Sequence, residues 1–347
     1  MTDPGIQTLR GREWAALGPR GRKLFVENAF AHWRTRGFPH YELSNADVDT
    51  EFANLLAQPV VRMHPAGVTG SNTGLRLANF FQPQMWSVGV SRYMSPADVF
   101  YDDAMLRLAI ERSLTIWPDR FGANPATLRR MLKTFPGVAS VSNFRPTLAR
   151  SVIEHFSKEG ETVLDFSAGY GGRVLGALVA GRRYLGIEPC LAQVKGLRRM
   201  IRALRRFRTP TESEILRGCA EDVLPNLPDR SVGLVFSSPP YFNWERYDDH
   251  RSQSFIRYRS YAEWRDGFLA PTLQHSARVL YTGAHLVLNL SGRRRQPSSE
   301  DAIDICKRAG LTHSARVPLL ISRIPYLHPR NDNPHKSEEL LIFIKGR

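Results

Sequence analysis

The residues best suited to chemistry are Ser238, Pro239, Pro240 and Tyr241, which follow the apolar run 232–236. Two successive prolines supply no N–H group and fix φ, so they end a strand in a stiff turn. The Ser238 hydroxyl and the Pro239 carbonyl can accept hydrogen bonds from an amino group, and Tyr241 can stack on a flat ring. These four residues are predicted to be catalytic toward an aromatic ring that carries an exocyclic NH₂ group. An ordinary strand-ending turn is the alternative interpretation of so short a motif.

A glycine-rich segment forms the second candidate site. Residues 161–172 read as a strand that ends at Asp165, followed by a turn containing Gly169 and Gly171. Glycines let the backbone pass close beneath a ligand and open the next helix toward it. The following short strand ends at Glu188, and an acidic residue about 20 positions after such a loop typically binds ribose hydroxyls. A dinucleotide-binding dehydrogenase is the competing interpretation, but its Gly-x-Gly-x-x-Gly would follow the strand directly.

Taken in order, these motifs resemble those of the DNA amino-methyltransferases, which use S-adenosylmethionine to methylate N4 of cytosine or N6 of adenine. The cofactor loop of that family typically reads Asp-Pro-Phe-x-Gly-x-Gly. Here residues 165–171 read Asp-Phe-Ser-Ala-Gly-Tyr-Gly, which keeps the aspartate and both glycines but has Phe-Ser where Pro-Phe is usual. The resemblance covers about residues 141–347 and implies S-adenosyl-L-methionine as the cofactor.

The resemblance also implies which residues bind the cofactor. Residues 143–146, Asn-Phe-Arg-Pro, resemble the family segment that closes over the cofactor, and residues 218–222 resemble the strand end beside its adenine. The family often has Gly-Asp-Ala at that strand end, so Cys219 is off-pattern and Glu221 or Asp222 can substitute. The implied cofactor-binding residues are Asn143, Phe144, Asp165, Ser167, Ala168, Gly169, Gly171, Glu188, Glu221 and Asp222.

Ser238 bears on the choice of substrate. Serine before Pro-Pro-Tyr is most common in the family members that make N4-methylcytosine, whereas Asp or Asn is usual for N6-methyladenine. The resemblance therefore implies cytosine in DNA, flipped out of the duplex. N6-adenine methylation, RNA amino-methylation and a non-catalytic nucleic-acid-binding protein are the alternatives. A restriction endonuclease is a candidate partner. Trp244, Arg246 and Tyr247 could line the entrance, although ordinary packing explains the two aromatic residues equally well.

The charge balance favours a polyanionic partner. The chain has 347 residues, with 48 Lys and Arg against 33 Asp and Glu, which gives a formal net charge of +15. Such a balance fits nucleic acid, although basic proteins also arise without such a partner. The arginines cluster in helix 190–207 and in a run after a predicted strand, formed by Arg293, Arg294 and Arg295. We expect the run to contact the DNA backbone, whereas the helix arginines also fit a solvated face.

The cysteines, the histidines and the apolar residues argue against a disulfide-linked, metal-binding or membrane-spanning protein. The three cysteines are isolated, and neither they nor the ten histidines have metal-binding spacing, so we expect no disulfide framework and no metal. No apolar stretch approaches 18 residues, which predicts no membrane span. The N-terminus lacks the basic and apolar regions of a signal peptide. We expect a cytoplasmic protein of a prokaryote or a phage.

From residue 143 onward, predicted helices and strands alternate. Strands are expected at 162–165, 184–188, 214–217, 231–236, 285–290, 313–321 and 339–345, and helices at 146–156, 172–180, 190–207, 260–280 and 299–309. This pattern predicts an α/β fold with a mainly parallel seven-stranded sheet and helices on both faces. The resemblance implies that this is the Rossmann-like arrangement of class I methyltransferases. Residues 1–140 are predicted to be a mostly helical region that recognises the target, or else a buttress for the catalytic domain, 141–347.

Overall fold

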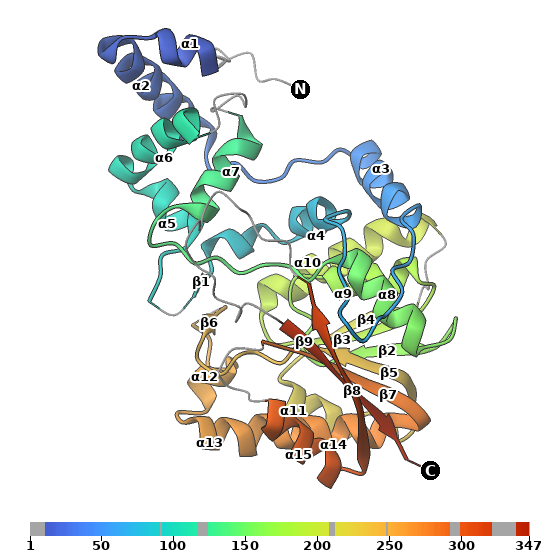
Figure 1. Cartoon of the computed structure of the whole chain (residues 1–347). Coiled ribbons are helices and arrows are strands. Elements are labelled where there is room, and N and C mark those ends of the chain that lie inside the picture. The colour runs from blue at the N-terminus through green and yellow to red at the C-terminus, as the bar shows by residue number, and fades with distance from the viewer. Residues whose placement is uncertain are drawn as a thin grey trace. The chain divides into compact units, whose positions relative to one another are not determined.

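A seven-stranded sheet organises the C-terminal part of the chain, with the strand order β4-β3-β2-β5-β7-β9-β8 (Figure 1). The computed structural model describes residues 11–90, 92–116, 124–207, 212–247, 249–291, 299–320 and 338–346. The strands of the sheet are β2 (Thr162–Asp165), β3 (Arg183–Glu188), β4 (Glu214–Arg217), β5 (Val232–Ser237), β7 (Leu280–Ser291), β8 (Leu311–Leu319) and β9 (Glu338–Lys345). The first five are parallel, and β9 is antiparallel to both of its neighbours. The predicted mainly parallel seven-stranded sheet is therefore confirmed.

Helices cover both faces of this sheet (Figure 1). One layer contains α8 (Pro146–Phe156), α9 (Gly172–Val179) and α10 (Leu191–Leu204), and the other contains α11 (Ala220–Val223), α14 (Ala270–Val279) and α15 (Ser299–Arg308). Shorter elements are η2 (Arg205–Phe207), η3 (Leu224–Asn226), β6 (Glu245–Arg246), α12 (Ser254–Arg257) and α13 (Tyr261–Trp264). Strand β7 begins at Leu280 rather than at 285, and β8 lies two positions earlier than predicted.

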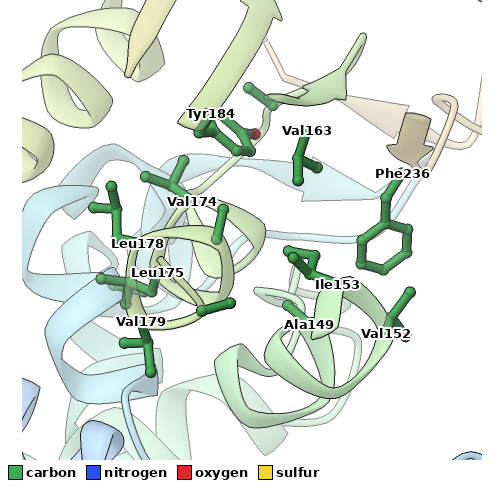
Figure 2. Packing of buried hydrophobic residues seen from close by; sticks show 14 of the residues in the cluster. Ala149, Val152, Ile153, Val163, Val174, Leu175, Leu178, Val179, Tyr184 and Phe236 are labelled. Carbon is green, nitrogen blue, oxygen red and sulfur yellow. The ribbon is translucent and has the colours of Figure 1, made fainter. Parts of the chain in front are cut away.

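The core follows the two-residue period of the strands, because successive side chains point to opposite faces. Val163, Leu234 and Phe236 pack in the layer of α8 to α10, whereas Leu164 and Val235 pack in the other layer. Figure 2 shows Val163 and Phe236 close to α8, with their side chains directed toward it. Each layer therefore fixes one face of β2 and β5, the two strands that end at the candidate sites.

The predicted helix 260–280 is interrupted. It divides into α13, a π-helical turn η4 (Arg265–Leu269) and α14. Pro271 lacks the N–H group that would bond to the carbonyl of Gly267, four residues earlier. The Tyr258 hydroxyl instead donates to the Gly267 carbonyl over 2.8 Å. The interruption therefore has a local cause, and a distant side chain satisfies the released acceptor.

The N-terminal region does not form a single unit with a boundary at residue 140. Contacts divide the chain into Met1–Glu42 with Pro83–Val141, and Leu43–Gln82 with Ser142–Arg347. Helices α3 (Asn45–Leu56) and α4 (Leu75–Phe81) belong to the sheet unit because their apolar residues join the core of α8 to α10. The first unit holds α1 (Gly11–Ala16), α2 (Pro19–Arg36), η1 (Pro83–Ser87), β1 (Gly89–Val90), α5 (Pro96–Tyr101), α6 (Asp103–Ile116) and α7 (Pro125–Thr134). Its predicted mostly helical character is confirmed for the described residues. None of the described helices has both the length and the apolar character needed to cross a membrane.

Candidate cofactor and catalytic site

The glycine-rich loop lies between β2 and α9, and its backbone requires glycine. Gly169 and Gly171 have φ of +57° and +91°, in the left-handed region that other residues rarely adopt. A Cβ at Gly172 would lie 1.9 Å from the Phe144 carbonyl oxygen. Asn143 holds the loop, since its Oδ1 accepts from Gly172 N over 2.9 Å and its Nδ2 donates to the Tyr170 carbonyl over 2.9 Å. Asn143 and Phe144 thus contact the loop and fix its shape, and their contact with the cofactor stays a prediction.

Asp165 lies at the centre of a buried network beneath this loop. Its side chain is fully buried, and Oδ2 accepts from Arg173 Nε over 2.5 Å and from the Tyr184 hydroxyl over 2.6 Å. Its Oδ1 accepts from the Ser237 hydroxyl over 2.7 Å and from Ser167 N over 3.2 Å. These donors tie Asp165 to the loop and to the neighbouring elements, so its carboxylate helps to hold the loop in place. The predicted contact between Asp165 and the cofactor stays a prediction.

Burial and charge together set the protonation of this network. Burial acts to lower the pKa of the Arg173 guanidinium, but the charge of Asp165 and the hydrogen bond to it, with smaller effects of Tyr184 and Tyr247, together outweigh burial and raise that pKa. Burial, reinforced by the Asp165 charge, also holds the pKa of Tyr184 well above its usual value. The network therefore holds a charged guanidinium and a neutral tyrosine, both of which donate to the Asp165 carboxyl group. Ser237, directly before the Ser-Pro-Pro-Tyr motif, ties that motif to the glycine-rich loop.

Glu188 ends β3 directly beside the loop. Its Oε2 accepts from Gly169 N over 3.0 Å, and its Oε1 accepts from Cys190 N over 2.9 Å. The side chain is almost completely buried, and this burial raises its pKa to about 7, although the two N–H donors act in the opposite direction. The structure thus brings together the two predicted cofactor contacts, Gly169 and Glu188, and gives the carboxylate a protonation equilibrium near neutral pH.

A third cluster follows the end of β4. Arg257 donates to both oxygens of Asp222 over 2.6 and 2.9 Å, which lowers the pKa of that carboxyl. Glu221 Oε1 lies 3.0 Å from the oxygen of the Tyr258 hydroxyl, which donates to the Gly267 carbonyl, and burial raises the pKa of Glu221. Within the described part of the chain, Glu221 Oε2 and Gln253 Nε2 are buried and have no hydrogen-bond partner. Of the two predicted substitutes for the family's aspartate, Glu221 therefore keeps a vacant acceptor.

The same cluster is poorly suited to a metal ion. Ligand atoms of Cys219, Glu221 and Asp222 lie within 4.8 Å of one another. Arg257 forms ion pairs with both carboxylates, so its charge already balances much of theirs. Burial, together with the Glu221 charge, raises the pKa of the Cys219 thiol, which disfavours the thiolate that a metal needs. A hydrogen-bonding role for this cluster fits these contacts better.

The Ser-Pro-Pro-Tyr motif leaves β5 next to β7. The Ser238 hydroxyl donates to the backbone carbonyl of Asn289 over 3.1 Å. The Asn289 side-chain Nδ2 lies 3.4 Å from Ser238 Oγ and 3.1 Å from Glu338 Oε2. Because the hydroxyl proton is directed to Asn289, the remaining role of Ser238 Oγ is that of an acceptor. Pro239 is buried, whereas Ser238 and Tyr241 are partly exposed. This geometry suits acceptance of a hydrogen bond from an amino group.

The residue after the motif is held in a strained conformation. Phe242 has φ of +40°, which is uncommon for a bulky side chain. Its N–H donates to the Pro240 carbonyl over 3.0 Å, and its ring packs edge-on against Tyr261 and Trp264. The surrounding aromatic cluster therefore holds the tight turn, as expected where strain is kept at a functional site.

The predicted entrance residues have different environments. The Tyr247 ring lies 6.0 Å from the Tyr170 ring of the glycine-rich loop, so the segment after the motif contacts the loop. The Arg246 guanidinium lies 5.8 Å from the centre of the Phe255 ring. Trp244 is partly buried, and its backbone N–H donates to the Tyr241 backbone carbonyl over 2.8 Å. The predicted backbone contacts Arg293, Arg294 and Arg295 lie outside the described residues.

Several residues of the site were not predicted. Arg173 and Tyr184 complete the Asp165 network, Gln253 has a buried side-chain N–H group without a partner among the described residues, and Asn289 contacts Ser238. The sequence could have indicated Ser237, since it directly precedes the motif and the alternation of side chains along a strand turns it away from Ser238. It could not have indicated Tyr184, because a tyrosine at the start of a buried strand is typical of any core.

Comparisons with known proteins found similar solved structures but no matching family or curated protein. Among solved structures the chain is similar to TrmN from Thermus thermophilus, with 15% identity and a TM-score of 0.39 over 58% of this chain and 48% of TrmN. It is also similar to a TehB-like SAM-dependent methyltransferase from Corynebacterium glutamicum, with 15% identity and a TM-score of 0.38 over 59% of this chain and 89% of that one.

A third similar structure is magnesium protoporphyrin IX methyltransferase from Synechocystis with bound SAM, with 12% identity and a TM-score of 0.37 over 54% of this chain and 71% of that one. The chain thus spans about half the length of TrmN, and these likenesses are confined to the fold. The fold assignment rests on the strand order of the sheet and on its antiparallel strand β9. The chain has the predicted Rossmann-like fold of class I methyltransferases.

Proposed function

We propose that the protein is a DNA methyltransferase that transfers a methyl group from S-adenosyl-L-methionine to the exocyclic N4 amino group of cytosine. The observation that carries this proposal is the hydrogen bond from Ser237 to Asp165, over 2.7 Å. It joins the strand that presents Ser238 to the strand that leads into the glycine-rich loop. A motif suited to an amino group and a loop suited to a nucleoside cofactor therefore lie at adjacent strand ends, where parallel α/β sheets bind ligands.

The residues present fit the cofactor. Gly169 and Gly171 give the loop the left-handed backbone that glycine allows, and Glu188 presents a nearly buried carboxylate beside Gly169. The vacant acceptor Glu221 Oε2 and the vacant donor Gln253 Nε2 match the amino group and the ring nitrogen on the edge of an adenine. Glu188 would hold the ribose hydroxyls, and Glu221 with Gln253 would hold the adenine. When bound, the cofactor supplies a methyl group that its sulfonium already activates.

The chain's own contribution to catalysis is positioning and electrostatics. The lone pair of an aromatic amine is delocalised into the ring, which makes the nitrogen a poor nucleophile. Hydrogen bonds from the NH₂ group to Ser238 Oγ and to the Pro239 carbonyl favour a pyramidal nitrogen whose lone pair is available. Tyr241 stacks on the ring that has been flipped out of the duplex. This mechanism requires neither a metal nor a covalent intermediate.

One observation keeps adenine as the second candidate base. Serine favours cytosine partly because a hydroxyl can donate toward the ring nitrogen beside the amino group. In the structure the Ser238 proton is directed to the Asn289 carbonyl over 3.1 Å, so the hydroxyl presents an acceptor alone. An acceptor suits the amino group of either base. N6-adenine methylation therefore remains the runner-up, and the serine at 238 still favours cytosine through the resemblance.

Recognition of the DNA is proposed to involve further parts of the chain. The net charge of +15 supports binding to a polyanion. Arg246 and the run Arg293–Arg295 would contact the backbone, and Trp244 with Tyr247 would line the entrance for the flipped base. Sequence recognition is assigned to residues 1–42 and 83–141, which form a unit separate from the sheet. A restriction endonuclease that cuts the same site is the proposed partner.

The test is the base composition of DNA from cells that express the protein. The DNA is digested to nucleosides and measured by mass spectrometry, with the Ser238→Ala and Tyr241→Ala variants as matched controls. We expect N4-methyldeoxycytidine with the wild-type protein and its loss in both variants. N6-methyldeoxyadenosine alone would establish the runner-up, and methylated RNA with unmodified DNA would overturn the proposed substrate.

A further inference from the structure

A second basic feature lies on the sheet unit, away from the candidate catalytic site. A cavity of about 300 Å³ lies between α10 and the edge strand β4, and its lining includes three arginines and one carboxylate. The lining residues are Arg198, Ile201, Arg202, Arg205, Ser213, Glu214 and Ile215. Glu214 begins β4, whereas the cofactor cluster follows the other end of that strand. The cavity is therefore separate from the proposed cofactor site.

The three arginines form one stripe. Residues 198, 202 and 205 are spaced at i, i+4 and i+7 on α10 and its 3₁₀ extension, so they share a helix face. Val194, Leu197 and Ile201 of the same helix are buried in the core, which fixes the helix against the sheet. Arg198 Nη2 donates to the Ile215 carbonyl over 2.7 Å, so the stripe is anchored to β4.

The charge of this stripe is poorly balanced by the protein. Other exposed arginines nearby have acidic partners, such as Arg206 with Asp49. Among the residues that the structure describes, the side chains of Arg202 and Arg205 form no hydrogen bond and no ion pair, although the Arg205 backbone N–H donates to the Arg202 carbonyl. Glu214 is the single carboxylate in the lining, against three guanidinium groups. Like charges on successive helical turns repel each other, and an anion in the cavity would relieve that repulsion.

We propose that this cavity binds a phosphate group of the nucleic acid backbone. Guanidinium groups match the planar, two-pronged hydrogen bonding of phosphate oxygens, and a partly enclosed pocket strengthens such bonds. The inference rests on the proposed function, because the polyanion is the nucleic acid substrate. The contact adds affinity without sequence information, since phosphates position a protein and bases specify the site.

The test is the salt dependence of DNA binding by the full-length protein. A fluorescently labelled DNA duplex is titrated between 50 and 200 mM salt with wild-type protein and with the Arg202→Ala/Arg205→Ala double variant. Each lost phosphate contact lowers the slope of log affinity against log salt by about 0.9. We therefore expect a slope that is smaller by about 1 to 2 and an affinity reduced by roughly tenfold at low salt.

The matched control is the Arg265→Ala/Arg308→Ala double variant, which removes the same charge from exposed arginines with acidic partners. Calorimetric titration with S-adenosylhomocysteine checks that both variants keep the cofactor site. If the Arg202/Arg205 variant matches this control in slope and affinity, the phosphate site is overturned and the proposed function stands. If the wild-type protein fails to bind DNA at all, both the site and the proposed substrate are overturned.

Discussion

Replacing Arg173 with methionine should strongly destabilise the protein. Arg173 and Asp165 are buried, with side-chain exposures of 8% and 0%, and they form an ion pair over 2.5 Å. The variant leaves the Asp165 carboxylate buried with the neutral donors of Tyr184 and Ser237 but without its cation. Removing one partner of a buried ion pair typically costs about 3–5 kcal/mol. That is a large part of the 5–15 kcal/mol that stabilises a typical domain.

Urea denaturation followed by circular dichroism measures this loss. The Asp165→Asn/Arg173→Met double variant removes both charges, so it should recover at least half of the lost free energy of unfolding. Arg183→Ala is the matched control, because Arg183 pairs with Glu212 at the surface and such pairs contribute about 0–1 kcal/mol. The reasoning is refuted if Arg173→Met costs no more than this control, or if the double variant is as unstable as the single one.

Three further predictions concern the site. Burial raises the pKa of Glu188 to about 7, and ribose hydroxyls donate to the ionised carboxylate. Affinity for S-adenosylhomocysteine, measured by calorimetry, should therefore increase about tenfold for each unit by which the pH increases toward 7, and it should level off above pH 7. Glu188→Gln should remove that dependence, and a flat wild-type profile from pH 5.5 to 8 would contradict the assignment. In Gly172→Ala the new Cβ would lie 1.9 Å from the Phe144 carbonyl oxygen, so the thermal unfolding temperature and the cofactor affinity should both fall. If both values equal those of the wild-type protein, the loop tolerates the side chain. Asn289→Leu should lower turnover by acting through Ser238, so it should have little further effect in a Ser238→Ala background, whereas fully additive losses would separate the two residues.

The sequence was sufficient to predict where β2 and β3 end, and it placed the end of β5 within one residue. Apolar runs bounded by Asp165, Glu188 and Ser238 located these strands, and parallel connection then placed their carboxyl ends at one edge. The structure agrees because the signals are local: a buried strand and a glycine-rich or proline-rich turn. Such features depend on residues that are adjacent in the chain.

The roles of individual side chains were harder to predict, because they depend on contacts between distant residues. The sequence predicted Asp165 as a cofactor contact, which stays a prediction, but it gave no sign that Arg173, Tyr184 and Ser237 bind its carboxylate from three other elements. No local pattern distinguishes an acidic residue that faces a ligand from one that is paired beneath it. The position of residues 43–82 was missed for the same reason, since their place in the sheet unit follows from packing on α8 to α10.

Methyl transfer by the purified protein tests the central claim most directly. The protein is incubated with S-adenosylmethionine that carries a deuterated methyl group, together with DNA in one reaction and RNA in another. The nucleosides are then analysed by mass spectrometry. We predict deuterated N4-methyldeoxycytidine in the DNA reaction, none in the RNA reaction, and none with Ser238→Ala. Absence of the label from both nucleic acids, with the cofactor bound, would contradict the assignment of the protein as a nucleic acid methyltransferase.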